Sequence, residues 1–295
     1  MTEIWKMNAT RLGEKLAKEQ EFTSLPVDPK QIAHTLGIVI EPLPSDRTSV
    51  SGMLVYVKNE NTGNDIFGIK YATYIDNPGF QNFSISHELG HYHIPGHPQA
   101  LLGNGYHESR AGFITDDRYE LEADHFAAGL LMPGYLFDKA LNEVQSGLAA
   151  IEKLSNQCET SLTSTAIRYA QRSPDPVAII VSEGPITLYC FMSDELRELK
   201  ELNWIKKNTP LPRNSHTFAF NQSEKNVASG ARVDGAATLS DWFSCDLNYE
   251  VYEEVIGLGG YGKTLTVLSV EELPEQEDID EEDELIDSWK PKFKR

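Results

Sequence analysis

Residues 83–91 read Phe-Ser-Ile-Ser-His-Glu-Leu-Gly-His and contain the pattern His-Glu-x-x-His. On a helix, His87 and His91 are four residues apart, so both project from one face, where two imidazoles can hold one metal ion. Glu88 lies beside them, and its carboxylate can take a proton from an attacking water and pass it to a leaving amine. These are parts of a zinc hydrolase site, although an ordinary amphipathic helix matches the pattern by chance as readily.

A second helix, predicted over residues 119–132, offers the third protein ligand that catalytic zinc sites usually have. Its apolar residues recur at helical spacing and form one buried stripe: Ala123, Phe126, Ala127, Leu130 and Leu131. At about 100° per residue, Glu120 falls inside this stripe and Asp124 at its edge. Because a charged carboxylate in an apolar face needs a partner or a metal, we expect Glu120 to be the ligand and Asp124 to orient a ligating histidine. We expect Glu122 and His125 on the solvated side of the helix.

His97 is a rival for the position of the third ligand. The residues from His87 onward nearly match the metzincin signature His-Glu-x-x-His-x-x-Gly-x-x-His, in which His97 has the correct spacing. However, Ile94 occupies the place where that signature needs a glycine for a sharp turn. The sequence therefore disfavours His97 as the third ligand without excluding it. We expect His93 and His107 either in a loop or next to the ligands without binding the metal themselves.

The two motifs together resemble those of the ImmA/IrrE family of bacterial and phage metallopeptidases. In that family His-Glu-Leu-Gly-His and Glu-x-Glu-Ala-(Asn/Asp)-x-Phe-Ala-x-x-Leu-Leu-Met-Pro recur together, and this chain has Gly129 where a glutamate is common. The resemblance covers roughly the first 175 residues. It implies a gluzincin-like site in which His87, His91 and Glu120 bind zinc and Glu88 is catalytic.

Length, charge and composition argue against several other classes of protein. A chain of 295 residues is long enough for two domains, and its net charge of −19 disfavours broad, non-specific affinity for nucleic acid. The cysteines, Cys158, Cys190 and Cys245, lack paired spacing, so neither a disulfide framework nor a structural zinc cluster is indicated. No apolar run approaches membrane-spanning length and the N-terminus lacks a signal peptide, so we expect a cytoplasmic protein with no membrane partner.

We predict an α+β protein in four parts: a zinc metallopeptidase domain (1–133), a helical helix-turn-helix-like segment (134–175), a second α+β domain (176–272) and an acidic disordered tail (273–295). In the resembling family the helical segment need not bind DNA. Arg168 and Arg172 are expected to be its few exposed cations, so a packing role is our default. The resemblance to relatives of IrrE implies that the second domain is a GAF-like sensor.

Several strands are expected from short apolar runs: residues 38–40, 52–57, 65–71, 177–181, 186–191 and 264–268. The run 66–71 comes directly before the motif helix. It is our candidate for a sheet edge that aligns an extended substrate, although an ordinary internal strand is almost equally consistent. A Glu- and Leu-rich stretch over 194–204 predicts a helix in the second domain.

Residues 257–264 satisfy the Walker A pattern letter for letter. A phosphate-binding loop needs a strand before it and a helix after it, so that backbone amides and the helix N-terminus meet the phosphates. Here an acidic segment over 249–256, which we expect to be helical, precedes the glycines and a strand follows. We interpret the motif as a glycine turn and not as an ATP site.

The expected activity is that of a zinc-dependent endopeptidase, with Mn²⁺ as an alternative metal. The resemblance implies a helix-turn-helix repressor as substrate, whose cleavage would derepress a stress, mobile-element or phage-defence operon. One alternative is a regulator that sequesters the repressor without cutting it. Another acts through the C-terminal domain, which would sense single-stranded nucleic acid or a small molecule; there Trp204 lies beside Lys206 and Lys207.

Overall fold

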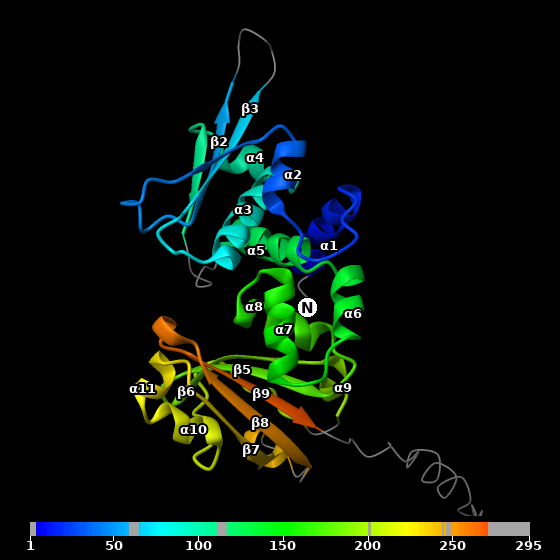
Figure 1. The fold of residues 1–295 in the computed structure, drawn as a ribbon, viewed down its shortest axis with the longest axis vertical. Coiled ribbons are helices and arrows are strands. Elements are labelled where there is room, and N and C mark those ends of the chain that lie inside the picture. The colour runs from blue at the N-terminus through cyan, green and yellow to red at the C-terminus, as the bar shows by residue number, and fades with distance from the viewer. Residues whose placement is uncertain are drawn as a thin grey trace, which may run out of the picture. The chain divides into compact units, whose positions relative to one another are not determined.

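The computed structural model describes residues 4–58, 65–110, 117–199, 202–243, 245 and 249–270. The predicted acidic tail over 273–295 lies outside these residues. The chain divides into two compact units, Met1–Pro174 with Phe191–Ser193 and Asp175–Cys190 with Asp194–Arg295. Each unit contains helices and a sheet (Figure 1), so the α+β class is confirmed. None of the described helices is long and apolar enough to cross a membrane.

The sheet of the first unit has the order β1-β3-β2-β4, formed by β1 (Val39–Pro42), β3 (Ile66–Tyr71), β2 (Gly52–Val57) and β4 (Tyr106–Ser109). Strand β1 is parallel to β3, and the other neighbours are antiparallel. Strand β3 is therefore internal, and the prediction that it forms a substrate-aligning edge is wrong because β1 and β2 occupy both of its edges. Leu54 and Ile69 point to the same face of the sheet and are fully buried.

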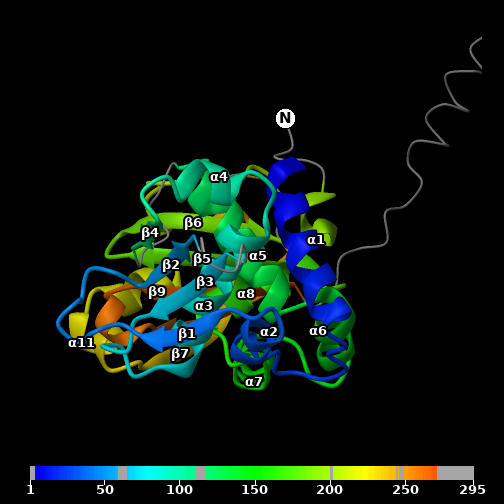
Figure 2. The ribbon, with the colours of Figure 1, turned by 90° about the horizontal axis from the view of Figure 1, so that it is seen from above.

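Helix α3 (Pro78–His93) covers the buried face of this sheet, and α2 (Pro29–Thr35) packs beside α3 and β1 (Figure 2). The first unit also contains α1 (Ile4–Glu19), α4 (His97–Leu101), α5 (Arg118–Leu131), α6 (Gly134–Leu141), α7 (Leu148–Cys158) and α8 (Leu162–Arg172). Helix α3 packs on β2 and β3, and α5 packs against both α3 and α1. The two helices that carry the sequence motifs thus lie side by side between the sheet and α1.

Helix α3 begins at Pro78, more than two turns before His87. Asn77 caps it by accepting a hydrogen bond from the backbone N–H of Phe80, and Pro78 takes the first helical position, where proline is favoured. Asn82 lies inside the helix and donates its side-chain amide to Glu159. These turns before the histidines anchor the motif helix in the core.

The helix-turn-helix-like segment packs within the first unit. Arg168, expected to be exposed, is buried; its Nε donates to the carbonyl of Met132 at 3.0 Å, and its guanidinium pairs with Glu14 on α1. Arg172 pairs with Asp138. The arginine that the sequence assigns to solvent thus joins three elements, which agrees with a packing role for the segment.

The second unit has a sheet of order β6-β5-β9-β8-β7, formed by β6 (Ile186–Met192), β5 (Val177–Glu183), β9 (Thr264–Val270), β8 (Glu250–Gly257) and β7 (Arg232–Thr238). Short helices join these strands: α9 (Asp194–Arg197), α10 (His216–Asn221), α11 (Glu224–Ala228) and α12 (Leu239–Trp242). Within the described residues, the helix predicted over 194–204 is limited to the single turn of α9.

The glycine-rich Walker-like sequence joins two antiparallel strands. Strand β8 leads into it, a single 3₁₀ turn η1 (Gly259–Tyr261) lies within it, and β9 follows, so the glycines are followed by a strand and not by a helix. The interpretation as a glycine turn is confirmed, but the helix expected over 249–256 is wrong. Glu253 on β8 is fully buried and accepts hydrogen bonds from Thr217, so this acidic run forms a strand with an inward carboxylate.

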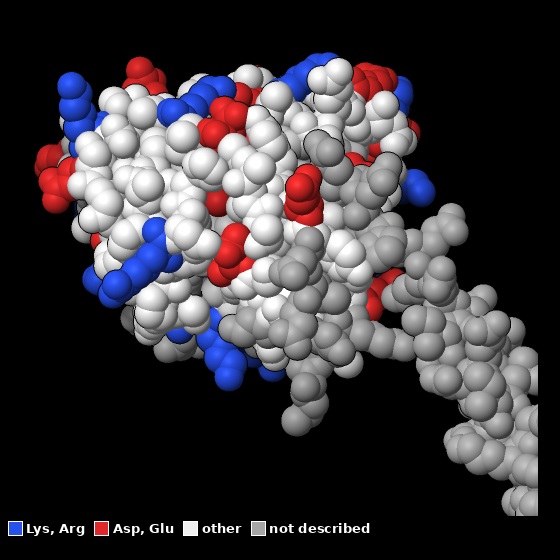
Figure 3. Space-filling model, turned by 90° about the horizontal axis from the view of Figure 1, so that it is seen from below, with Lys and Arg blue, Asp and Glu red and all other residues white. Residues whose placement is uncertain are grey.

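Charged side chains are mixed on the face of the molecule seen in Figure 3. Lysines and arginines stand singly or in small groups among acidic and uncharged atoms, and the described atoms of this face form no continuous basic area. Nucleic-acid backbones are usually bound by such a continuous basic area. This face therefore gives no support to nucleic-acid binding.

Candidate metal centre

Three side chains from two helices converge in the first unit. His87 and His91 come from α3, and Glu120 comes from the first turn of α5, whose start is fixed by the cap residue Asp117. The Nε2 atoms of the two histidines are 3.0 Å apart. Glu120 approaches both, with Oε2 3.2 Å from Nε2 of His87 and Oε1 3.3 Å from Nε2 of His91. The structure thus brings together the three ligands predicted from the sequence.

The spacing of these atoms fits a divalent metal ion. Tetrahedral zinc bound to two imidazole nitrogens at about 2.0 Å separates them by about 3.3 Å, close to the distances within this trio. Two imidazole lone pairs that face each other repel unless a proton or a metal lies between them. Two imidazoles and one carboxylate are also a frequent donor set for catalytic zinc.

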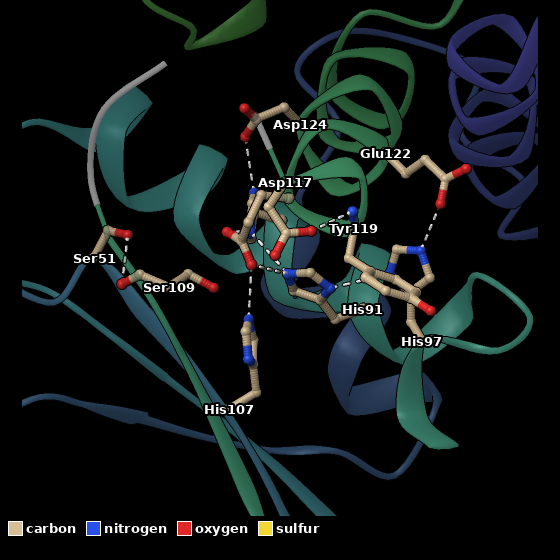
Figure 4. A network of polar contacts seen from close by, with 11 residues as sticks. Ser51, His91, His97, His107, Ser109, Asp117, Tyr119, Glu122 and Asp124 are labelled. Atoms are coloured by element: carbon tan, nitrogen blue, oxygen red, sulfur yellow. Dashed lines mark hydrogen bonds and ion pairs between the residues drawn. The ribbon is translucent and has the colours of Figure 1, made fainter. Parts of the chain in front are cut away.

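Asp124, one turn after Glu120 on α5, lies behind His87. Its Oδ1 is 2.9 Å from Nδ1 of His87 (Figure 4). A carboxylate in this position fixes the tautomer of the ring and leaves the other nitrogen free to bind a metal. The geometry agrees with the orienting role that the sequence suggests for Asp124.

The remaining histidines take two different places. His107 lies on β4, and its Nε2 is 2.8 Å from Oε1 of Glu120 (Figure 4). His97 lies behind His91, with the two Nδ1 atoms 3.0 Å apart and its Nε2 2.9 Å from Oε2 of Glu122. Both ring nitrogens of His97 therefore face other side chains, and Glu120 holds the position for which His97 was the rival.

Glu122 and His125 are not on a solvated face, so that prediction is wrong. Glu122 is only 9% exposed and accepts two hydrogen bonds of 3.0 Å from Arg118, one turn back on the same helix, besides its contact with His97. His125 is half-buried and meets the edge of the Trp5 ring, with centroids 6.5 Å apart. The apolar periodicity of α5 could not predict that Glu122 and His125 are buried, because their contact partners come from other segments or lie at the start of the helix.

Glu88 is fully buried, and neither of its carboxylate oxygens has a hydrogen-bond partner within the described residues. Its carboxylate lies against Gly52 on β2, where a Cβ atom would overlap it. A buried carboxylate without a donor is costly, so this group is poised for a partner at the centre. Gly52 was missed by the sequence analysis, because nothing in residues 50–57 marks this glycine as part of a site.

A family model supports the assignment of this domain. Residues 71–168 match the Peptidase_M78 model, described as the IrrE N-terminal-like domain. The chain carries an IrrE N-terminal-like domain. The match runs from the end of β3 into α8 and includes all the site residues named above except Gly52.

Other comparisons are more distant. A solved structure of a Mycobacterium tuberculosis transcriptional regulator matches with a TM-score of 0.52 and 14% sequence identity, over 92% of this chain and 77% of that chain. At this identity the match shows a similar fold. No curated protein sequence matches the chain. The GAF-like character of the second unit stays a prediction.

The electrostatics of the IrrE N-terminal-like domain favour a cation at its centre. Burial lowers the pKa of His91 to about 3, so this ring is neutral, as a metal ligand must be. Burial would also lower the pKa of His87, but Asp124 and Glu120 outweigh it and raise the value to about 10. The carboxylates thus stabilise positive charge where the predicted metal would lie. Burial raises the pKa of Glu88 to about 7, which suits a group that exchanges protons near neutrality.

Proposed function

We propose that this protein is a zinc-dependent endopeptidase with His87, His91 and Glu120 as metal ligands and Glu88 as the catalytic acid and base. The observation that carries the proposal is the trio of ligand atoms at 3.0 to 3.3 Å beside the buried, unpaired carboxylate of Glu88. A structural metal site would need no such carboxylate. Manganese is an alternative metal, because this donor set accepts it as well.

The chain's residues supply orientation and proton transfer. A zinc ion in the site would polarise a peptide carbonyl and lower the pKa of a water molecule. Glu88 then takes the proton from the attacking water and returns it to the amine that leaves. Asp124 holds the ring of His87, and His107 donates to Glu120 and keeps that carboxylate turned toward the histidines.

We further propose that the substrate is a helix-turn-helix repressor, cleaved in an extended segment, and that cleavage derepresses a stress, mobile-element or phage-defence operon. Strand β4 is an edge of its sheet and carries His107 to the centre, so it is the edge along which such a segment would pair. The net charge of −19 suits a basic DNA-binding partner. The resemblance of the two sequence motifs to ImmA/IrrE peptidases supports this class of substrate.

The test is incubation of the protein with the helix-turn-helix regulator encoded beside its gene, with zinc, manganese or a chelator. We expect the wild type to cleave the regulator when metal is present, and Glu88→Gln to bind it but cleave it about 10²- to 10⁴-fold more slowly, since a general acid or base contributes that much. Glu19→Gln, an exposed change on α1, is the matched control and should cleave normally.

Two outcomes would favour other functions. If Glu88→Gln relieves repression as well as the wild type, the protein acts by sequestration. If neither cleaves, but the full chain binds single-stranded nucleic acid in a salt-sensitive way that is lost on replacing Lys206 and Lys207, the second unit is the functional part. Trp204 there is 46% exposed under the guanidinium of Arg197 and would be the stacking residue.

A further inference from the structure

A chain of polar contacts runs from His91 away from the centre (Figure 4). The Nδ1 atoms of His91 and His97 are 3.0 Å apart, and Nε2 of His97 is 2.9 Å from Oε2 of Glu122. The other oxygen of Glu122 accepts two hydrogen bonds of 3.0 Å from Arg118. His97 is 1% exposed, so water does not compete for these contacts.

The positions of the hydrogens in this row of contacts follow from the metal-facing nitrogen of His91 at one end and the carboxylate of Glu122 at the other. Nε2 of His91 faces the centre and must be unprotonated to bind metal, so its Nδ1 carries the hydrogen and donates it. Nδ1 of His97 must then accept, and Nε2 of His97 carries the hydrogen that Glu122 accepts. The contacts are satisfied by one tautomer of each ring, with both rings neutral.

We propose that His97 is a positioning residue for the metal ligand His91, which it restrains as an acceptor while Glu122 and Arg118 fix its own tautomer. The inference rests on the proposed metal centre. A ligating histidine is commonly restrained by a carboxylate or carbonyl, as Asp124 restrains His87; here a second imidazole takes that place for His91.

The local fold explains how His97 reaches this position. Gly96 has a φ of +92°, a left-handed conformation that glycine adopts without strain, and it turns the chain back after α3. His97 is therefore the first residue of α4 and points under α3 toward His91. The Tyr119 ring meets it edge-on, with centroids 4.9 Å apart, and closes the other side.

Two substitutions of His97 test separately the acceptor at Nδ1, which faces His91, and the donor at Nε2, which faces Glu122. His97→Asn places an amide oxygen where Nδ1 lies, so His91 keeps an acceptor. His97→Gln places its amide where Nε2 lies, so Glu122 keeps a donor but His91 loses its acceptor. The measurement is zinc affinity of the full-length protein by competition with a chelator. We expect His97→Gln to bind zinc about 10- to 100-fold more weakly, and His97→Asn to stay within about threefold of the wild type.

Equal affinity in all three proteins, or an equal loss in both variants, would overturn the proposal, because a role in packing alone does not distinguish the two amides. His93→Gln, near the C-terminal end of α3 and packed on Phe126 outside this chain of contacts, should leave affinity unchanged. As a second readout, ¹⁵N shifts of the zinc-loaded wild type should show hydrogen on Nε2 and not on Nδ1 of His97. The reverse tautomer would also overturn it.

These measurements do not use peptide cleavage. A wild type that binds zinc tightly and cleaves nothing would contradict the proposed peptidase and leave the role of His97 intact. A wild type that binds no zinc would overturn both.

Discussion

Gly52 sets the space in which Glu88 can act. It lies on β2 directly against the Glu88 carboxylate, and a methyl group at this position would overlap the carboxylate and force it aside. The three atoms nearest to such a methyl group all belong to Glu88 and not to the candidate metal ligands, so we expect metal binding and proton transfer to be separable at this residue. In a site of this kind a shift of about 1 Å in a reacting group costs about 10²-fold in rate.

We therefore predict that Gly52→Ala lowers the turnover number of peptide cleavage about 10²-fold while zinc affinity stays near that of the wild type. Gly68→Ala on the neighbouring strand β3 is the matched control, because a Cβ there meets only ordinary contacts of 3.6 Å or more. The turnover number is measured from cleavage rates, and zinc affinity from chelator competition, on the same preparations of both variants and the wild type. An unchanged turnover number, or a loss of zinc affinity equal to the loss of rate, would contradict this account of Gly52.

The three residues of the candidate metal centre could be chosen from the sequence, whereas the contacts that support them could not. Glu120 stood out because a carboxylate inside an apolar helical stripe needs a metal or a partner. Glu122 sits on the flank of the same helix, where the periodicity of α5 predicts solvent, and only its contacts with Arg118 and His97 explain its burial. Gly52 meets Glu88 across the sheet, and no local pattern records that contact.

At the scale of elements, α1 and α5 pack at backbone contact. A Cβ at Gly13 on α1 would overlap the backbone of α5 near Phe126, and one at Gly129 on α5 would overlap the carbonyl of Thr10 on α1. Gly129, where the resembling family commonly has glutamate, thus permits this close crossing. The crossing braces the helix that presents Glu120.

Gly129→Ala should destabilise the first unit by about 1–3 kcal/mol, the usual cost of forcing extra atoms into a packed contact. Alanine is intrinsically the better helix former by about 1 kcal/mol, so stabilisation by this change would show that the helices move apart freely. Gly103→Ala, where a Cβ meets open space, is the control. Urea unfolding of the metal-free protein, followed by circular dichroism, measures both changes.

Element types were largely predictable, whereas strand order was not. The pattern of apolar residues correctly predicted α5 and β2, because each buries mainly one face. Helix α3 was predicted from its motif, and its residues 84–91 are buried on all sides. The place of β3 between β1 and β2 depends on pairing between distant segments. Strand β8 was expected to be a helix, because the sequence does not show that Thr217 supplies the donors that let Glu253 point inward.

At the scale of the whole molecule, the two units each have a buried cysteine that can report on them separately. Cys158 ends α7 in the first unit, and Cys190 lies on β6 in the second. Burial raises the pKa of both thiols to about 12, so both are protonated and inert at pH 8 until their surroundings open. Cys245 is only half-buried and is best replaced by serine in such an experiment.

We predict that zinc protects Cys158 and leaves Cys190 unaffected. A ligand at 100 times its dissociation constant stabilises the unit that binds it by about 2.7 kcal/mol, which lowers the open population about 100-fold. Labelling of Cys158 by a thiol reagent in mild denaturant should therefore slow by up to this factor in zinc compared with chelator, as followed by peptide mass spectrometry. Equal protection of both cysteines would show that the units unfold together, and protection of neither would show that no metal binds the folded first unit. Protection of Cys158 alone would establish both the metal centre and the independence of the unit that lacks it.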